Sequence, residues 1–129
     1  MSDKGIDIGV VIRDSAAALR FYRDTVGMEH VGDVEALTGM MHRLQWGSSV
    51  VKLTRPHEPP VAANPPGGFL AGTGIRYFTL SVPDLDGIVA RCEAAGYTTA
   101  ITRTEVRPGV VIAVVEDCEG NWVEFLQAS

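Results

Sequence analysis

The chain has 129 residues, of which 46% are hydrophobic and 21% are charged, a length and composition typical of one globular domain with a sizeable core. The formal net charge of -5 argues against binding to nucleic acid or anionic lipid, and no apolar run reaches membrane-spanning length. Residues 1–5 lack the apolar stretch of a signal peptide, so we expect a cytoplasmic protein with no nucleic-acid or membrane partner.

The first half of the chain is predicted to contain a strand, a helix and three further strands. The strands are predicted over residues 6–12, 28–35, 39–46 and 49–54, and the helix from residue 15 to about 26. Asp14 or Ser15 can cap this helix at its start, and Gly27 stands where a left-handed C-cap is favoured. Gly47-Ser48 is typical of a tight hairpin turn between the last two strands.

The second half repeats this order of elements. Strands are predicted over residues 75–82, 97–104, 110–116 and 122–126, with a helix between Asp84 and Gly96. An internal repeat of this size indicates two modules of β-α-β-β-β order, and therefore an α+β fold. The following side chains are expected to be buried between helices and sheets: Leu19, Tyr22, Leu85, Ile88 and Val89.

The two modules are predicted over residues 5–55 and 74–127 of a single domain, joined by a connector over residues 56–73. The connector is rich in proline and glycine, which argues against a helix or a central strand within it. It is either a passive linker or a lid over a cavity, because long loops in compact domains are often functional.

The two cysteines, Cys92 and Cys118, lie far apart in the sequence, and Cys92 falls on the apolar stripe of the second helix. Reduced thiols are the better interpretation for a cytoplasmic protein, and a disulfide is the alternative.

Three segments give the chain a family resemblance. They are Val11-Ile12-Arg13-Asp14 before the first helix, Phe21 to Met28 at its end, and the acidic turn and strand from Glu116 to Phe125. With the repeat, they resemble the vicinal oxygen chelate superfamily, which includes glyoxalases, extradiol dioxygenases, bleomycin-resistance proteins and methylmalonyl-CoA epimerase. The resemblance implies curled sheets that form a cup with the helices outside, and it implies a homodimer.

In that family, four inward side chains hold a divalent metal. Each module supplies two of them, one from its first strand and one from its last strand. Carried over by position, these places fall on Asp7, Lys52, Tyr77 and Glu124. An ammonium group has no lone pair to give, and a protonated phenol is a poor ligand. We therefore expect no metal cofactor at this quartet and no transition metal in the purified protein.

The quartet has two other interpretations. Lys52 can act as a fixed charge that replaces the metal between Asp7 and Glu124. Alternatively, the quartet is a metal-free acid–base site, with Glu124 or Asp7 as base and Lys52 or Tyr77 stabilising an oxyanion.

Strand alternation extends this site to ligand-binding side chains. A two-residue turn at Gly47-Ser48 places Arg43 opposite Lys52, and two neighbouring cations favour an anionic ligand. The other expected ligand-binding residues are Gln45, Thr79 and Trp122. The three histidines, His30, His42 and His57, show no ligand spacing and are interpreted as surface or loop residues.

Three functions remain open. The first is a metal-independent lyase or isomerase of the glyoxalase-like group, acting on a small organic and possibly anionic metabolite. The second is a binding protein without chemistry, like the drug-sequestering members of the family. The third, a metal-dependent glyoxalase or dioxygenase with unusual ligands, is disfavoured because no histidine falls on the quartet.

Overall fold

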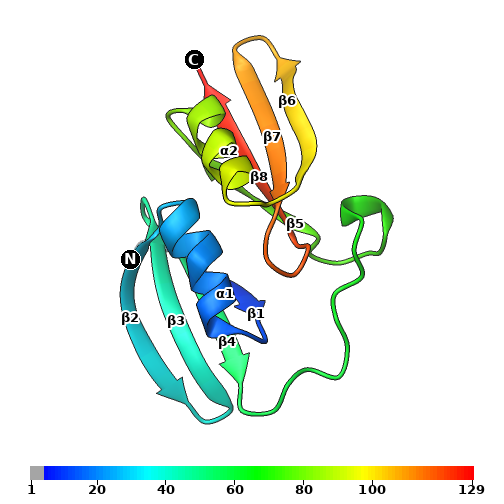
Figure 1. The fold of residues 1–129 in the computed structure, drawn as a ribbon. Helices are drawn as coiled ribbons and strands as arrows, with labels where there is room; N and C mark the ends of the chain where they lie inside the picture. The colour runs from blue at the N-terminus through cyan, green and yellow to red at the C-terminus, as the bar shows by residue number, and fades with distance from the viewer. Residues whose placement is uncertain (1–4) are drawn as a thin grey trace. The chain divides into compact units, whose positions relative to one another are not determined.

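The β-α-β-β-β repeat is present in the structure, a computed structural model that describes residues 5–129 (Figure 1). The first four residues, part of the segment predicted not to be a signal peptide, lie outside the described residues. The chain divides into two compact units, here called the N-terminal unit, which ends at Ala62, and the C-terminal unit, Ala63–Ser129. Among the described residues, no helix has the length and apolar character needed to cross a membrane.

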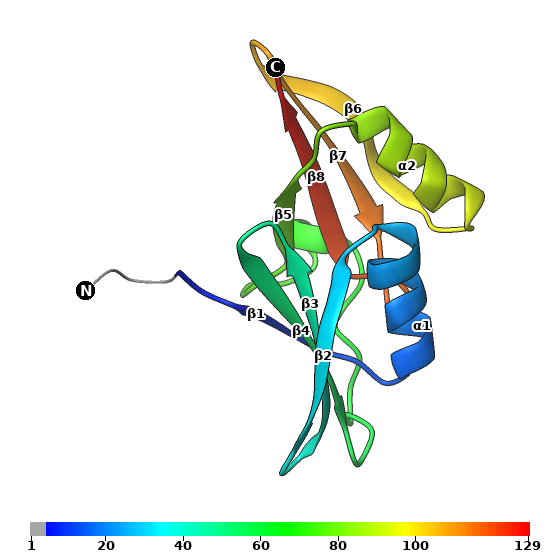
Figure 2. The same ribbon diagram turned by 90° about the vertical axis from the view of Figure 1, so that its left-hand side faces the viewer.

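The N-terminal unit is one four-stranded sheet covered on one face by a helix (Figure 2). Its elements are β1 (Ile8–Val11), α1 (Ser15–Leu19), its π-helical continuation η1 (Arg20–Thr25), β2 (Glu29–Ala36), β3 (Gly39–Trp46) and β4 (Ser49–Pro56). The strand order is β1-β4-β3-β2. The β1–β4 pair is parallel, and the other pairs are antiparallel.

The C-terminal unit has the same topology. Its elements are the single 3₁₀ turn η2 (Gly68–Leu70), β5 (Tyr77–Ser81), α2 (Leu85–Ala94), β6 (Thr99–Arg107), β7 (Val110–Glu116) and β8 (Trp122–Ala128). The strand order is β5-β8-β7-β6, with β5 parallel to β8. In each unit, the first strand therefore lies at one edge of the sheet beside the last strand.

Helix caps explain why both helices begin at equivalent places in the repeat. The carboxylate of Asp14 accepts a hydrogen bond from the backbone N–H of Ala17 at 3.1 Å, and Asp84 accepts one from Gly87 at 3.1 Å. Gly27 and Gly96 follow the two helical segments with φ angles of 96° and 94°, a conformation that favours glycine. These contacts confirm both predicted helix boundaries.

The first helix differs from the prediction because its second half is π-helical. The N–H of Val26 reaches back five residues to the carbonyl of Phe21, at 2.9 Å. The buried face nevertheless keeps ordinary helical spacing, because Ala18, Phe21, Tyr22, Thr25 and Val26 are buried. Leu19 lies beside this face and is only half-buried. In α2, Leu85 and Ile88 are buried as expected, whereas Val89 is half-buried.

The connector contains structure that the sequence argued against. Despite its proline and glycine content, η2 forms one 3₁₀ turn, which begins after Gly67 in a left-handed conformation. The guanidinium of Arg76 donates hydrogen bonds to the carbonyl of Gly68 at 2.8 Å, to the side chain of Asn64 at 2.6 Å, and to the carbonyl of Pro65. This part of the connector is therefore fastened to the C-terminal unit.

Candidate functional site

The central strand β4 gives the N-terminal unit two distinct faces. Val51 and Leu53 are buried on the face that carries the helix, so Lys52 between them lies on the helix-free face. On that face the register places Lys52 between Gly9 of β1 and Arg43 of β3. The predicted neighbourhood of Arg43 and Lys52 is thereby confirmed.

Lys52 forms an ion pair with Asp7, the residue that precedes β1. The Lys52 Nζ atom is 3.2 Å from the Asp7 carboxylate, and the two side chains are 37% and 45% exposed. Lys52 therefore has a carboxylate partner within its own unit, at a partly hydrated position. Lys52 occupies one of the four positions that the resemblance assigns to the metal ligands. Its ammonium group, already paired with Asp7, has no lone pair with which to bind a divalent metal.

Arg43 differs from Lys52 because it has no partner among the described residues. Arg43 is half-buried, and within residues 5–129 its guanidinium forms no hydrogen bond and no ion pair. Gln45 lies on the same face of β3, and its amide donates to the carbonyl of Gly47 at 2.8 Å, which ties it to the β3–β4 turn. Arg43 is consequently the donor-rich side chain on this face that remains available to a ligand.

The helix-free face of the C-terminal unit carries Glu124 and Thr79. They are directly opposite one another on β8 and β5, and the Thr79 hydroxyl donates a hydrogen bond to Glu124 Oε1 at 2.6 Å. Val123 and Phe125, on the other face, are fully buried. The threonine fixes the orientation of the carboxylate, whose Oε2 atom accepts no hydrogen bond within the described part of the chain.

Aromatic side chains flank this carboxylate. Trp122 pairs with Tyr77 across β8 and β5, and its indole N–H donates to Glu116 at 3.3 Å. Phe69 from η2 contacts both rings edge-on, with centroids 5.3 Å from Trp122 and 6.4 Å from Tyr77. The sequence predicted Tyr77 and Trp122 as site residues but missed Phe69, because nothing in a proline-rich segment indicates where its turn docks.

The eight predicted site residues thus form two groups, one in each unit. The N-terminal group contains Asp7, Arg43, Gln45 and Lys52, and the C-terminal group contains Tyr77, Thr79, Trp122 and Glu124. The placement of Lys52 beside Asp7 is observed, whereas its placement beside Glu124 remains a prediction.

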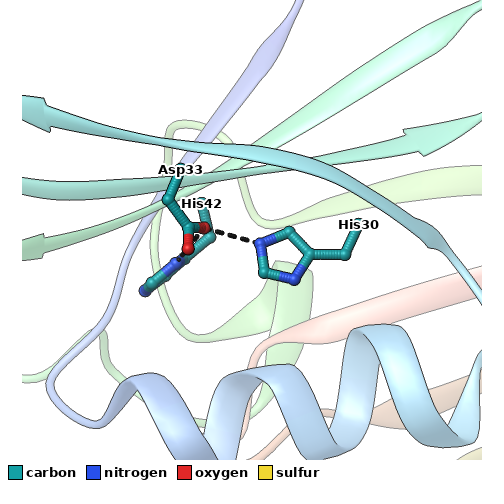
Figure 3. Close-up of side chains that lie close together, drawn as sticks. All are labelled: His30, Asp33 and His42. Atoms are coloured by element: carbon teal, nitrogen blue, oxygen red, sulfur yellow. Dashed lines mark hydrogen bonds and ion pairs between the residues drawn. The ribbon is translucent and has the colours of Figure 1, made fainter.

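Two of the histidines were misinterpreted from the sequence. His30 and His42 do not stand apart as surface or loop residues, because both imidazoles contact the carboxylate of Asp33 (Figure 3). His30 Nε2 and His42 Nδ1 lie 2.6 Å and 2.7 Å from Asp33 Oδ1. These hydrogen bonds, first that of His42 and then that of His30, lower the pKa of Asp33 below its usual range.

Comparison with known proteins identifies the family. The sequence profile of the Glyoxalase/Bleomycin resistance protein/Dioxygenase superfamily matches residues 7–125. The chain belongs to this superfamily. No curated protein sequence matches the chain.

Solved structures with the same fold include a glyoxylase/bleomycin resistance protein/dioxygenase domain from Frankia sp. EAN1pec, with a TM-score of 0.81 and 16% identity over 99% of this chain and 94% of that one. A glyoxalase family protein from Bacillus cereus also has a TM-score of 0.81, with 17% identity over 95% and 91%. TnmS3, an antibiotic binding protein from Streptomyces sp. CB03234, has a TM-score of 0.68, with 20% identity over 97% of both chains. At these identities the likeness shows the fold alone.

Proposed function

We propose that this superfamily member binds a small organic anion through Arg43 and Lys52. The observation that carries the proposal is the half-buried residue Arg43, whose guanidinium has no partner in residues 5–129 and which lies opposite a second cationic residue, Lys52. A guanidinium can bind a carboxylate or phosphate with two parallel hydrogen bonds. Because Lys52 is already paired with Asp7, the charge that an anionic ligand would offset is mainly that of Arg43.

The reaction class that we propose is metal-independent isomerisation or lyase chemistry with Glu124 as the base. Thr79 holds one carboxylate oxygen, and the second is available to accept a proton. The Tyr77 hydroxyl, on β5 in the same unit as Glu124, is the group that we propose to stabilise a developing oxyanion. No step requires a metal, because the donor set of the quartet does not fit one.

The aromatic group supports a second candidate function, binding of an antibiotic-like molecule without chemistry. Phe69, Tyr77 and Trp122 present edge-on ring contacts, and Phe69 and Tyr77 are about half exposed, at 55% and 48%. Exposed aromatic surface of this kind suits a flat organic ligand. TnmS3, which shares the fold, is described as an antibiotic binding protein.

The binding proposal is tested with a panel of small carboxylates and phosphate esters, screened by thermal shift and titrated by calorimetry. Arg43→Gln should weaken the binding of a positive compound by about 10–100-fold, the equivalent of one lost charge-assisted hydrogen-bonding group. Arg107→Gln, which removes an exposed arginine from β6, is the matched control and should bind like the parent. Equal affinity of the two variants would contradict an anion site at Arg43.

Turnover separates the two candidate functions. For an isomerase or lyase, the parent should consume or rearrange a bound compound, and Glu124→Gln should abolish turnover while the dissociation constant changes little. For a binding protein, the parent should return every bound compound unchanged, and replacing Phe69 with alanine should weaken aromatic ligands most.

A further inference from the structure

The strongest unassigned feature is the cluster of His30, Asp33 and His42, which lies on the helix-covered side of the β2–β3 hairpin. We propose that this cluster is a binding site for one divalent transition-metal ion of the class that imidazole prefers, with Zn²⁺ as the test ion. The site is separate from the helix-free face on which the family places its metal, and it does not depend on the proposed function.

A β-bulge creates the cluster. Residues three apart in a regular strand point to opposite faces, so His30 and Asp33 would normally diverge. The register of β2 against β3 shifts between His30 and Gly32, which leaves Val31 as an extra residue. His30 then pairs with Leu44, and Asp33 pairs with His42, so that both β2 side chains lie on the face that packs against the helix.

The three side chains converge closely enough to hold one ion. Their ligand atoms all lie within 4.8 Å of one another, and the two imidazole nitrogens are 2.6 Å and 2.7 Å from Asp33 Oδ1. Ligand atoms around tetrahedral Zn²⁺ are roughly 3.3 Å apart, given metal–ligand bonds of about 2.0–2.2 Å. Binding therefore requires the Asp33 carboxylate to move slightly away from both imidazoles and the two imidazole nitrogens to approach one another. Asp33, with a side chain 47% exposed, has room for this movement.

His42 is already oriented as a ligand. Its side chain is 9% exposed, and its Nε2 atom is 2.8 Å from the hydroxyl of Ser15 in the first turn of α1. When Nε2 donates to this hydroxyl, Nδ1 carries the lone pair that a metal requires. The Ser15 hydroxyl can accept a hydrogen bond from Nε2 or donate one to it, so it holds the imidazole in place in either tautomer of His42. Ser15 is therefore a positioning residue.

Arg23 is a cation beside the cluster and opposes metal binding. Its guanidinium is 3.5 Å from His30 Nδ1, and it also pairs with Asp24 at 2.8 Å. When His30 Nε2 binds a metal, Nδ1 carries a proton and no longer accepts from Arg23. The arginine side chain is 41% exposed and can turn away, so it lowers the affinity without blocking the site.

The test uses the full chain, stripped with a chelator and titrated with Zn²⁺ against a chromophoric chelator. The parent should bind one ion per chain, and Co²⁺ should give the visible spectrum of a site with nitrogen and oxygen ligands. His30→Gln, Asp33→Asn and His42→Asn should each weaken binding by more than the roughly 10–100-fold that is typical for loss of a group that only positions a ligand. Ser15→Ala should fall within that range, and Ser15→Thr should restore affinity.

The controls are chosen from the other potential ligands of the chain. His57→Gln and Cys118→Ser remove an exposed imidazole and an exposed thiol outside the cluster. Glu124→Gln removes the carboxylate at one of the four positions that hold the metal in the family. All three should bind Zn²⁺ like the parent, whereas Arg23→Gln should bind it more tightly. His30 and Asp33 are partly exposed, so at least two cluster variants should remain folded, which circular dichroism can verify.

Two results would overturn the proposal. One is a parent that binds no Zn²⁺ at micromolar concentration, which would make the cluster a hydrogen-bonded triad alone. The other is a folded His30→Gln or Asp33→Asn variant with unchanged affinity.

Discussion

The ammonium group of Lys52 lies beside a carboxylate but remains partly hydrated, and its energetic role follows from that exposure. Exposed ion pairs contribute about 0–1 kcal/mol, because water screens them and both side chains lose conformational freedom. Lys52→Met should therefore lower the free energy of unfolding by less than about 1 kcal/mol in denaturant melts.

A variant of Asp7, the ion-pair partner of Lys52, identifies the source of that loss in the free energy of unfolding. If the pair with Asp7 accounts for it, Asp7→Asn should cost about as much as Lys52→Met, and the double variant should cost little more. A loss of about 3–5 kcal/mol for Lys52→Met would instead support the interpretation that Lys52 is buried between two carboxylates.

The two thiols should differ in reactivity. Cys92 is fully buried and Cys118 is exposed, and burial raises the pKa of the Cys92 thiol from 9.0 to about 11. At neutral pH, a thiol reagent should modify Cys118 in the native protein and both cysteines after denaturation. Rapid modification of two thiols in the native state would contradict this placement.

The same pKa shift implies a pH dependence of stability. The Cys92 thiol has a higher pKa in the folded state than in the unfolded state. Its contribution to the free energy of unfolding is therefore fully present below pH 9.0 and is lost as pH rises toward about 11. The loss should be roughly 2–3 kcal/mol over that window. Cys92→Ala, measured in parallel by denaturant melts, should show a correspondingly shallower decline, and equal slopes would exclude Cys92 as the source.

At the scale of elements, η2 depends on close contact between Gly68 and the ring of Trp122. A Cβ atom at Gly68 would lie 2.4 Å from the ring, and the φ angle of 66° already favours glycine. Gly68→Ala should therefore cost about 1–3 kcal/mol and alter tryptophan fluorescence. Gly72→Ala is the control, because it meets no atom within 4 Å and should be close to neutral. Equal stability of the two variants would mean that η2 does not pack on Trp122.

The extent to which sequence predicts this structure differs between elements. The helix caps at Asp14 and Asp84 and the turn at Gly47-Ser48 were predictable, because each depends on residues adjacent in the chain. Correct prediction of this turn also placed Arg43 opposite Lys52. Local chemistry and strand alternation together were therefore sufficient to place Arg43 beside Lys52.

The remaining features depend on irregularities that periodicity does not reveal. The bulge at Val31 changes which face His30 occupies, and nothing in the helical periodicity of residues 15–26 indicates the π-turn that ends at Val26. Phe69 reaches Trp122 through a turn held by Arg76, a contact between distant residues. A single inserted residue reverses the sheet face that alternation predicts for every residue beyond it in the strand. The histidine cluster was missed for this reason.

For the whole molecule, we predict a homodimer. The family resemblance implies it, and each unit of about 60 residues has only a small core of its own. Several large apolar side chains are strongly exposed in the single chain, among them Leu37 at 96%, Leu70 at 90% and Ile75 at 80%. Apolar surface of this kind is often covered by association.

Sedimentation velocity at micromolar concentration should show a species of twice the chain mass, and dilution should reveal the monomer if the interface is of ordinary size. A charged residue at one of these exposed positions, such as Leu70→Asp, should shift the equilibrium toward monomer when that position lies in the interface. Because Leu70 is 90% exposed in the single chain, the substitution should leave the circular dichroism spectrum unchanged. A parent protein that sediments only as a monomer throughout the micromolar range would contradict the dimer.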